Sequence, residues 1–193
     1  PGQITEAEEK AFCAGVYYHS YEKLGAHPIE LNGVTGTSFA VWAPNALRVS
    51  VVGDFNNWDG RCHMMHRMPM SGIFELFIPG VKAGEIYKYE MKLKGGTVQM
   101  KSDPYAACTE LPPASASVVA DLRDFQWDDA KWMEERIRFR DRKQPVSIYE
   151  TSLSNWKDTS ELVSYVKELK YTHVELHPVM EYLDEEAGEY STF

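Results

Sequence analysis

Gly53-Asp54-Phe55-Asn56-Asn57-Trp58-Asp59-Gly60 follows a strand-like run at residues 49–52 and consists almost entirely of turn-forming residues. Its asparagine and aspartate side chains can bond to local backbone, and we expect Gly53 and Gly60 to supply positive φ at either end. The stretch therefore predicts a tight turn that carries Phe55 and Trp58. An aromatic ring on a rigid turn is suited to stacking on a sugar. The alternative, a ring that caps a hydrophobic core, stays open for Trp58 and is the preferred interpretation of Phe55.

Around this turn the chain shows the pattern of an all-β domain from residue 31 to residue 122. In residues 37–42 the side chains alternate, with Phe39 and Val41 on one face and Ala40 and Trp42 on the other. Short strands separated by glycine and proline turns are typical of a β-sandwich. The strands that we expect lie at residues 37–42, 49–52, 73–78, 86–93, 98–101 and 117–120.

The flanks of this domain carry weaker signals. Residues 1–30 are predicted to be a lead-in segment, which opens at Thr5 with an N-capped helical turn or a frayed end and has its regular structure broken at Gly25 and Pro28. Asp103-Pro104-Tyr105 is interpreted as a structural turn, because such turns are common for purely local reasons. Residues 123–145 are a mixed-charge connector, in which we expect a short helix near residues 129–136 with Trp132 facing a neighbour.

The pattern changes again at residue 146. Residues 146–150 are predicted to form a buried strand, residues 161–169 a helix capped by Asp158 or Ser160, and residues 172–176 a second strand. A strand, a helix and a strand joined by short connections form the repeating unit of α/β barrels. The apolar face expected for the helix comprises Leu162, Val163, Val166 and Leu169.

Length and composition limit the functions that are open. The chain has 193 residues, which is too short for a sandwich and a complete barrel of roughly 250 residues. Its formal charge of −9 argues against a nucleic-acid partner, and no apolar run predicts a membrane span. Three cysteines without metal or redox spacing, and no apolar leader, predict a reducing, cytoplasmic location.

Four blocks of sequence, in order, carry a family resemblance from about Tyr18 to Glu181. Residues 39–44 and 49–58 resemble the start of a family 48 carbohydrate-binding module. Residues 21–28, 148–150 and 171–181 resemble an α-1,4-glucan (glycogen or starch) branching enzyme. The resemblance implies a mainly β fold, in which an immunoglobulin-like β-sandwich is followed by an incomplete βαβ unit of a TIM-type barrel of glycoside hydrolase family 13. The expected boundaries are 1–30 lead-in, 31–122 sandwich, 123–145 connector and 146–193 truncated barrel start.

The resemblance also implies the chemistry. Branching enzymes form α-1,6 branches by a retaining mechanism, whose three carboxylates the family places beyond Phe193. We therefore assign no catalytic residue and expect the chain to be inactive alone and at most to bind α-glucan. Glu150, Glu175 and Glu181 are interpreted as structural. His173 and His177, four residues apart, do not converge when they lie on a strand, so we predict no metal and no cofactor.

Three residues are the predicted substrate-binding site. In glucan-binding members of the module family a tryptophan matching Trp58 stacks on glucose and a lysine matching Lys88 bonds its hydroxyls, with Asn57 beside the tryptophan. A second family tryptophan is replaced here by Thr97-Val98, which predicts weaker binding. The expected partners are glycogen, amylose or maltooligosaccharides and the rest of the barrel. Two alternatives remain: a stand-alone glycogen-binding regulatory protein, and a debranching or trehalose-releasing relative.

Overall fold

The computed structural model describes residues 2–111, 113–123, 126–139 and 145–177. These residues fall into two compact units, Pro1–Gln126 and Trp127–Phe193, and each unit is described by itself. None of the described helices is both long and apolar enough to cross a bilayer.

The first unit begins with helix α1 (Glu6–Cys13) and a short 3₁₀ turn, η1 (Ser20–Glu22). Thr5 is the N-cap, as predicted: its hydroxyl accepts from the Glu8 amide at 3.3 Å, and the Glu8 carboxylate accepts from the Thr5 amide at 2.7 Å. This reciprocal pair satisfies two backbone donors that a helix start otherwise leaves unbonded.

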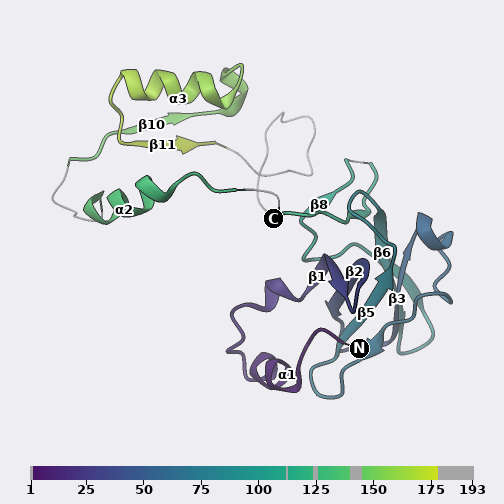
Figure 1. The fold of residues 1–193 in the computed structure, drawn as a ribbon. Helices are drawn as coiled ribbons and strands as arrows, with labels where there is room; N and C mark the ends of the chain where they lie inside the picture. The colour runs from purple at the N-terminus through teal and green to yellow at the C-terminus, as the bar shows by residue number, and fades with distance from the viewer. Residues whose placement is uncertain (1, 112, 124–125, 140–144, 178–193) are drawn as a thin grey trace. The chain divides into compact units, whose positions relative to one another are not determined.

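Two antiparallel sheets form the body of the first unit (Figure 1). One sheet has the order β1-β2-β5-β4 and the other the order β3-β6-β9-β8, with β7 also paired to β6. The strands are β1 (Gly25–Leu31), β2 (Val34–Trp42), β3 (Ala46–Gly53), β4 (His66–Arg67), β5 (Ile73–Pro79), β6 (Ile86–Leu93), β7 (Val98–Lys101), β8 (Cys108–Thr109) and β9 (Ser117–Val118).

The core lies between the two sheets. Phe39 and Val41 of β2 meet Tyr87 and Tyr89 of β6, and the rings of Phe39 and Tyr87 lie edge to face with centroids 5.0 Å apart. This burial of alternate residues from both sheets is that of a β-sandwich, and it confirms the predicted fold class. The predicted alternation in β2 is also confirmed, because Trp42 lies outside this core and is 54% exposed.

A second apolar cluster covers the opposite face of the β1-β2-β5-β4 sheet. Ala40 and Ile73 point to this face, and Ile4, Leu24 and Met68 pack with them, joined by Phe12 of α1. The first 24 residues therefore contribute core to the first unit.

The prediction that Gly25 and Pro28 break regular structure is wrong. Both lie in β1, where Pro28 pairs with Thr37 of β2. The strand is at the edge of its sheet, and an edge strand tolerates a proline because one side of its backbone needs no hydrogen-bond partner. The all-β pattern thus begins six residues before Leu31. The two-residue strands β4 and β8 were too short to predict.

The second unit contains helix α2 (Ala130–Phe139), strand β10 (Ile148–Thr151), the 3₁₀ turn η3 (Leu153–Asn155), helix α3 (Thr159–Glu168) and strand β11 (His173–Leu176). Strands β10 and β11 are parallel, which confirms the predicted βαβ unit. Asp158 caps α3 and accepts from the Glu161 amide at 2.9 Å.

Three details of the second unit differ from the prediction. The first strand is not buried as predicted: Val146 and Ile148 are 62% and 55% exposed, because the described residues form only a two-stranded β10-β11 sheet. Leu162 and Val166 of α3 are buried, but Val163 and Leu169 are 45% and 50% exposed, so the apolar face is narrower than expected. Trp132 of α2 does not pack against a neighbouring core: it is 56% exposed and stacks on its own helix, 5.7 Å from the Arg136 guanidinium carbon.

Candidate functional site

The Gly53–Gly60 turn is held by a buried asparagine. After β3 the chain enters a 3₁₀ turn, η2 (Asp54–Asn56). The Asn56 side chain accepts from the Gly53 amide at 3.0 Å and donates to the Val51 carbonyl at 2.9 Å. Asn56 therefore ties the turn back onto β3, as expected of an asparagine that bonds local backbone.

The predicted role of the two glycines is wrong. Gly53 has an extended backbone, with φ −176°, and the residues with positive φ are Asn57 at 53° and Trp58 at 58°. Gly53 is needed for close approach instead, because a Cβ there would lie 2.3 Å from the Ile86 carbonyl oxygen. A bulky aromatic residue in the left-handed region is strained, and such strain is concentrated at functional sites.

Phe55 and Trp58 have separate environments. Phe55 packs against the sandwich core, which confirms the structural interpretation of that residue. Trp58 is half-buried and does not belong to either core cluster. Its indole Nε1 donates to Asp54 Oδ1 at 2.7 Å, so the ring is oriented by its own turn. The alternative that Trp58 caps the core stays open beside the sugar-binding prediction.

Lys88 lies on the outward face of β6, between the core residues Tyr87 and Tyr89. It pairs with Val52, one residue before the Trp58 turn begins, and its Nζ donates to Ser115 Oγ at 2.9 Å. Asn57, Trp58 and Lys88 therefore belong to one strand pair and the turn that extends from it. Their role in binding sugar stays a prediction.

The hairpin that follows β6 adds an apolar residue to the same outward face. Val98 of β7 is 50% exposed and pairs with Lys92, which shares its face of β6 with Lys88. An aliphatic side chain is therefore exposed on this face of the hairpin.

Asp103 is structural, as predicted, but through contacts that its local sequence does not show. Its carboxylate accepts from the hydroxyls of Tyr87 and Tyr89 at 2.7 and 2.9 Å and from the Tyr105 amide at 2.8 Å. Burial raises the pKa of Asp103, although these three donors act in the opposite direction. The partners lie 14 and 16 residues away, so only the folded sandwich brings them together.

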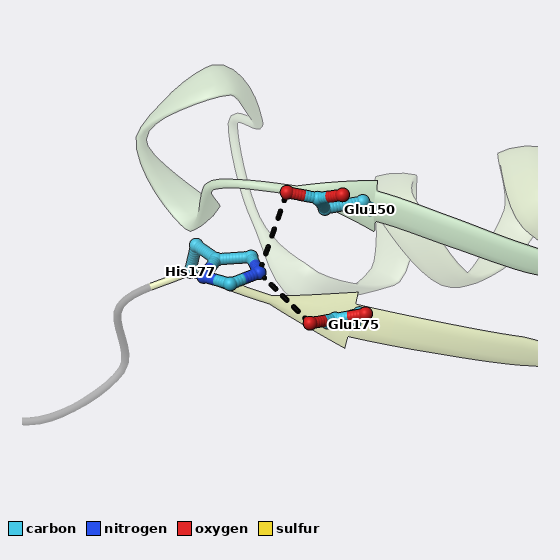
Figure 2. Close-up of side chains that lie close together, drawn as sticks. All are labelled: Glu150, Glu175 and His177. Carbon is cyan, nitrogen blue, oxygen red and sulfur yellow. Dashed lines mark hydrogen bonds and ion pairs between the residues drawn. The ribbon is translucent and has the colours of Figure 1, made fainter.

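At the ends of β10 and β11 a small polar cluster lies on the surface of the second unit (Figure 2). His177 Nε2 is 3.0 Å from Glu175 Oε1 and 3.4 Å from Glu150 Oε1, and all three side chains are exposed. His173 bonds Thr172 instead, so the two histidines do not act together. Sequence reasoning missed this cluster, whose signal is the parallel register that pairs Glu150 with Glu175. Glu181 lies outside the described residues.

The imidazole of His177 lies within ion-pair distance of both carboxylates when it is protonated. Exposed contacts of this kind contribute little to stability, and the structural role of Glu150 and Glu175 stays a prediction. Exposed acidic groups are common without an ion, and the cluster carries no metal proposal.

Residues 23–106 match the carbohydrate-binding module 48 family, described as the isoamylase N-terminal domain. Over 93% of its length the chain is similar to the 1,4-alpha-glucan branching enzyme GlgB of Synechococcus sp. (strain JA-3-3Ab), with 43% identity over 208 residues and 27% of that enzyme covered. The enzyme of the same name from Cereibacter sphaeroides is 46% identical over 190 residues, which cover 94% of this chain and 26% of the enzyme.

Residues 23–106 thus match carbohydrate-binding module 48, and the chain is similar to part of GlgB-type branching enzymes, which confirms the resemblance. The chain spans about a quarter of the length of these curated relatives.

Two solved structures share the fold. A putative alpha amylase from Salmonella typhimurium covers 84% of this chain with a TM-score of 0.57 and 20% identity, and 26% of that protein is matched. The pullulanase from Bacillus acidopullulyticus covers 82% with a TM-score of 0.55 and 23% identity, and 22% of it is matched. At these identities the likeness concerns the fold alone.

Proposed function

We propose that this chain is the α-glucan-binding N-terminal part of a 1,4-α-glucan branching enzyme, which forms α-1,6 branches in glycogen or starch. The observation that carries the proposal is the 43–46% identity to branching enzymes over 93–94% of the chain. This similarity runs through both the sandwich and the βαβ unit. It favours a branching enzyme over a stand-alone glycogen-binding module, for which similarity limited to the sandwich would suffice.

The chemistry of the whole enzyme is part of the same proposal. It is a glycosyl transfer with retention, in which carboxylates of the complete barrel act as nucleophile and as general acid and base. No catalytic role is assigned to Glu150 or Glu175, since both are engaged with His177 on the surface of the second unit. We expect the 193-residue chain to bind glucan without transferring it. Three exposed free cysteines, Cys13, Cys62 and Cys108, support a reducing cytoplasmic location.

In the proposed site the Trp58 indole stacks on the apolar face of a glucose unit of glycogen, amylose or a maltooligosaccharide. Lys88 and Asn57 bond its hydroxyls. The support is geometric: the ring is partly open, held at its Nε1 by Asp54, and carried by the turn next to the Val52–Lys88 pair. A neutral polymer needs no charge complementarity, so the net charge of −9 does not oppose binding.

Trp58→Ala is expected to abolish the retardation of the chain by glycogen in a native gel. Loss of one stacking ring costs about 1–2 kcal/mol, by analogy with bases stacked on aromatic side chains, or roughly five- to thirtyfold in Kd. Trp132→Ala is the matched control, because Trp132 is exposed in the second unit and should leave retardation unchanged. Lys88→Ala should weaken retardation less, by about 1 kcal/mol for one hydrogen bond.

Wild-type migration that glycogen does not change, with a folded chain, would contradict the binding proposal. Retardation that survives Trp58→Ala would place the sugar elsewhere. The next surface to test would be the groove of about 410 Å³ between β1, β2 and the 81–83 loop, lined by Ile29, Thr35, Val81 and Asp121.

A further inference from the structure

A polar layer lies between the β3–β6 strand pair and the chain that follows Trp58. Val49 and Val51 of β3 point into the core, so Arg48 and Ser50 point to the opposite face. Ser50 pairs with Glu90 of β6, which shares that face, and an Arg48 guanidinium nitrogen forms an ion pair with Glu90 Oε1. The Glu90 side chain is only 16% exposed.

The chain that follows Trp58 contacts this polar layer through Gly60. An added Cβ at Gly60 would lie 2.2 Å from Glu90 Oε1 and 2.6 Å from Oε2, so backbone and carboxylate are in direct contact. Beyond Gly60 the chain bonds to the edge of β3: the Val51 amide donates to the His63 carbonyl at 3.0 Å, and the Met65 amide donates to the Val49 carbonyl at 2.9 Å. Glu90 thus touches the backbone two residues after Trp58.

The layer is poorly suited to a purely stabilising role. A partly buried ion pair is often no more stable than apolar side chains of the same volume. In addition, Arg48 Nε and Ser50 Oγ are buried and have no hydrogen-bond partner among the described residues. Such departures from optimal packing are expected where geometry matters for function.

We propose that Glu90, held by Arg48, is a positioning residue for the saccharide site. Its carboxylate fixes Gly60 at the end of the turn. It thereby determines the position and orientation of the Trp58 ring relative to Lys88. Glu90 does not contact the sugar in this scheme. The inference rests on the proposed glucan binding and adds the residues that orient the site.

The contact is tested by a double-mutant cycle. Gly60 does not have a positive φ, so Gly60→Ala introduces only the methyl group that meets Glu90. Because Arg48 restrains the carboxylate, we expect the loop to move and the Kd for maltoheptaose, measured by isothermal titration calorimetry, to rise about tenfold. Glu90→Ala in the Gly60→Ala background removes the clash and is expected to recover part of that loss.

Glu90→Gln tests the ion pair while keeping the side-chain shape, and we expect it to raise the same Kd about threefold. Glu6→Gln is the matched control, since it breaks the Glu6–Lys10 pair of α1, and it should leave the Kd unchanged. If Glu90→Gln does not fold, Gly60→Ala still decides, because it retains Glu90.

A second measurement separates this inference from the proposed function. The Trp58 indole N–H signal in an NMR spectrum, assigned by its loss in Trp58→Phe, reports the hydrogen bond to Asp54 without any sugar. We expect a shifted signal and faster hydrogen exchange in Gly60→Ala and Glu90→Gln, and no change in Glu6→Gln. Unchanged indole signals and unchanged Kd values would overturn the positioning role. A wild-type chain that ignores maltoheptaose but shows the indole changes would contradict only the proposed function.

Discussion

Glu9→Ala is expected to lower the free energy of unfolding of the first unit by about 3–5 kcal/mol, measured by urea denaturation. The Glu9 carboxylate is 1% exposed and accepts three bonds at 2.9 Å, from the Met70 amide, the Ser71 amide and the Ser71 hydroxyl. Alanine leaves these donors without an acceptor, and each of the two buried donors of Ser71 then costs about 1–3 kcal/mol. It also releases α1 from the sheet that it covers.

The matched control for Glu9 is Glu6→Ala on the same helix. Glu6 is exposed and, among the described residues, pairs with Lys10, four residues on, so its loss should cost no more than about 0.5 kcal/mol. Equal effects of the two substitutions would show that α1 is not docked through Glu9.

The pH dependence gives a separate test of Glu9. Burial raises its pKa, but the bonds from Ser71 and Met70 outweigh burial, and the net pKa lies below its usual range. The folded carboxyl is then ionised where the unfolded one, at a pKa of about 4.3, is not. The contribution of Glu9 to the free energy of unfolding is full above the unfolded pKa and is lost as the pH falls through the lowered pKa of the folded state. As the pH is lowered from about 5 to about 3, the free energy of unfolding of Glu9→Ala should therefore fall less than that of wild type.

Asp103→Ala is expected to cost about 3–5 kcal/mol in the same measurement, because it leaves two buried tyrosine hydroxyls without their acceptor. Tyr87 and Tyr89 are fully buried, and both bond the same oxygen of Asp103. In a Tyr87→Phe, Tyr89→Phe background the cost of Asp103→Ala should fall sharply, because no hydroxyl is then left unpaired. An equal cost in both backgrounds would contradict the shared bond.

The sign of the pH effect at Asp103 is opposite to that at Glu9. Since its pKa is raised by burial, the folded state holds this proton more tightly than the unfolded state. Its contribution is largest below the unfolded pKa of about 3.9 and declines as the pH rises through the raised value. The free energy of unfolding of wild type, relative to that of Asp103→Asn, should decline as the pH rises over that interval.

Sequence reasoning was most successful where the signal is local. Period-two alternation in residues 37–42 placed Phe39 and Val41 in the core and Trp42 outside it, and the change of period after residue 146 predicted the βαβ unit. The N-caps Thr5 and Asp158 were readable because a cap bonds an amide three residues away. The blocks around residues 39–58 and 171–181 were sufficient for the family.

The errors have one physical cause, because each depends on contacts between residues that are distant in the sequence. Gly53 was assigned a positive φ from the composition of the turn. A glycine is needed there because a Cβ would clash with the Ile86 carbonyl oxygen, which belongs to another strand. Pro28 was treated as a breaker because only the sheet shows that its strand is at the edge. Trp132 was expected to face a neighbour, but within the described part of its unit it is 56% exposed and contacts Arg136 of its own helix.

The amino-acid sequence by itself determined most of the strands, the helices, the sandwich and the candidate residues Asn57, Trp58 and Lys88. Only the tertiary structure decided how the buried carboxylates are used: Glu9 bonds residues about 60 positions away, and Glu90 lies under a turn 30 positions earlier. Periodicity and capping depend on neighbours within a few residues, so they can be read along the chain. The partners of a buried charge are set by which strands meet, and that information appears only once the sheets have formed.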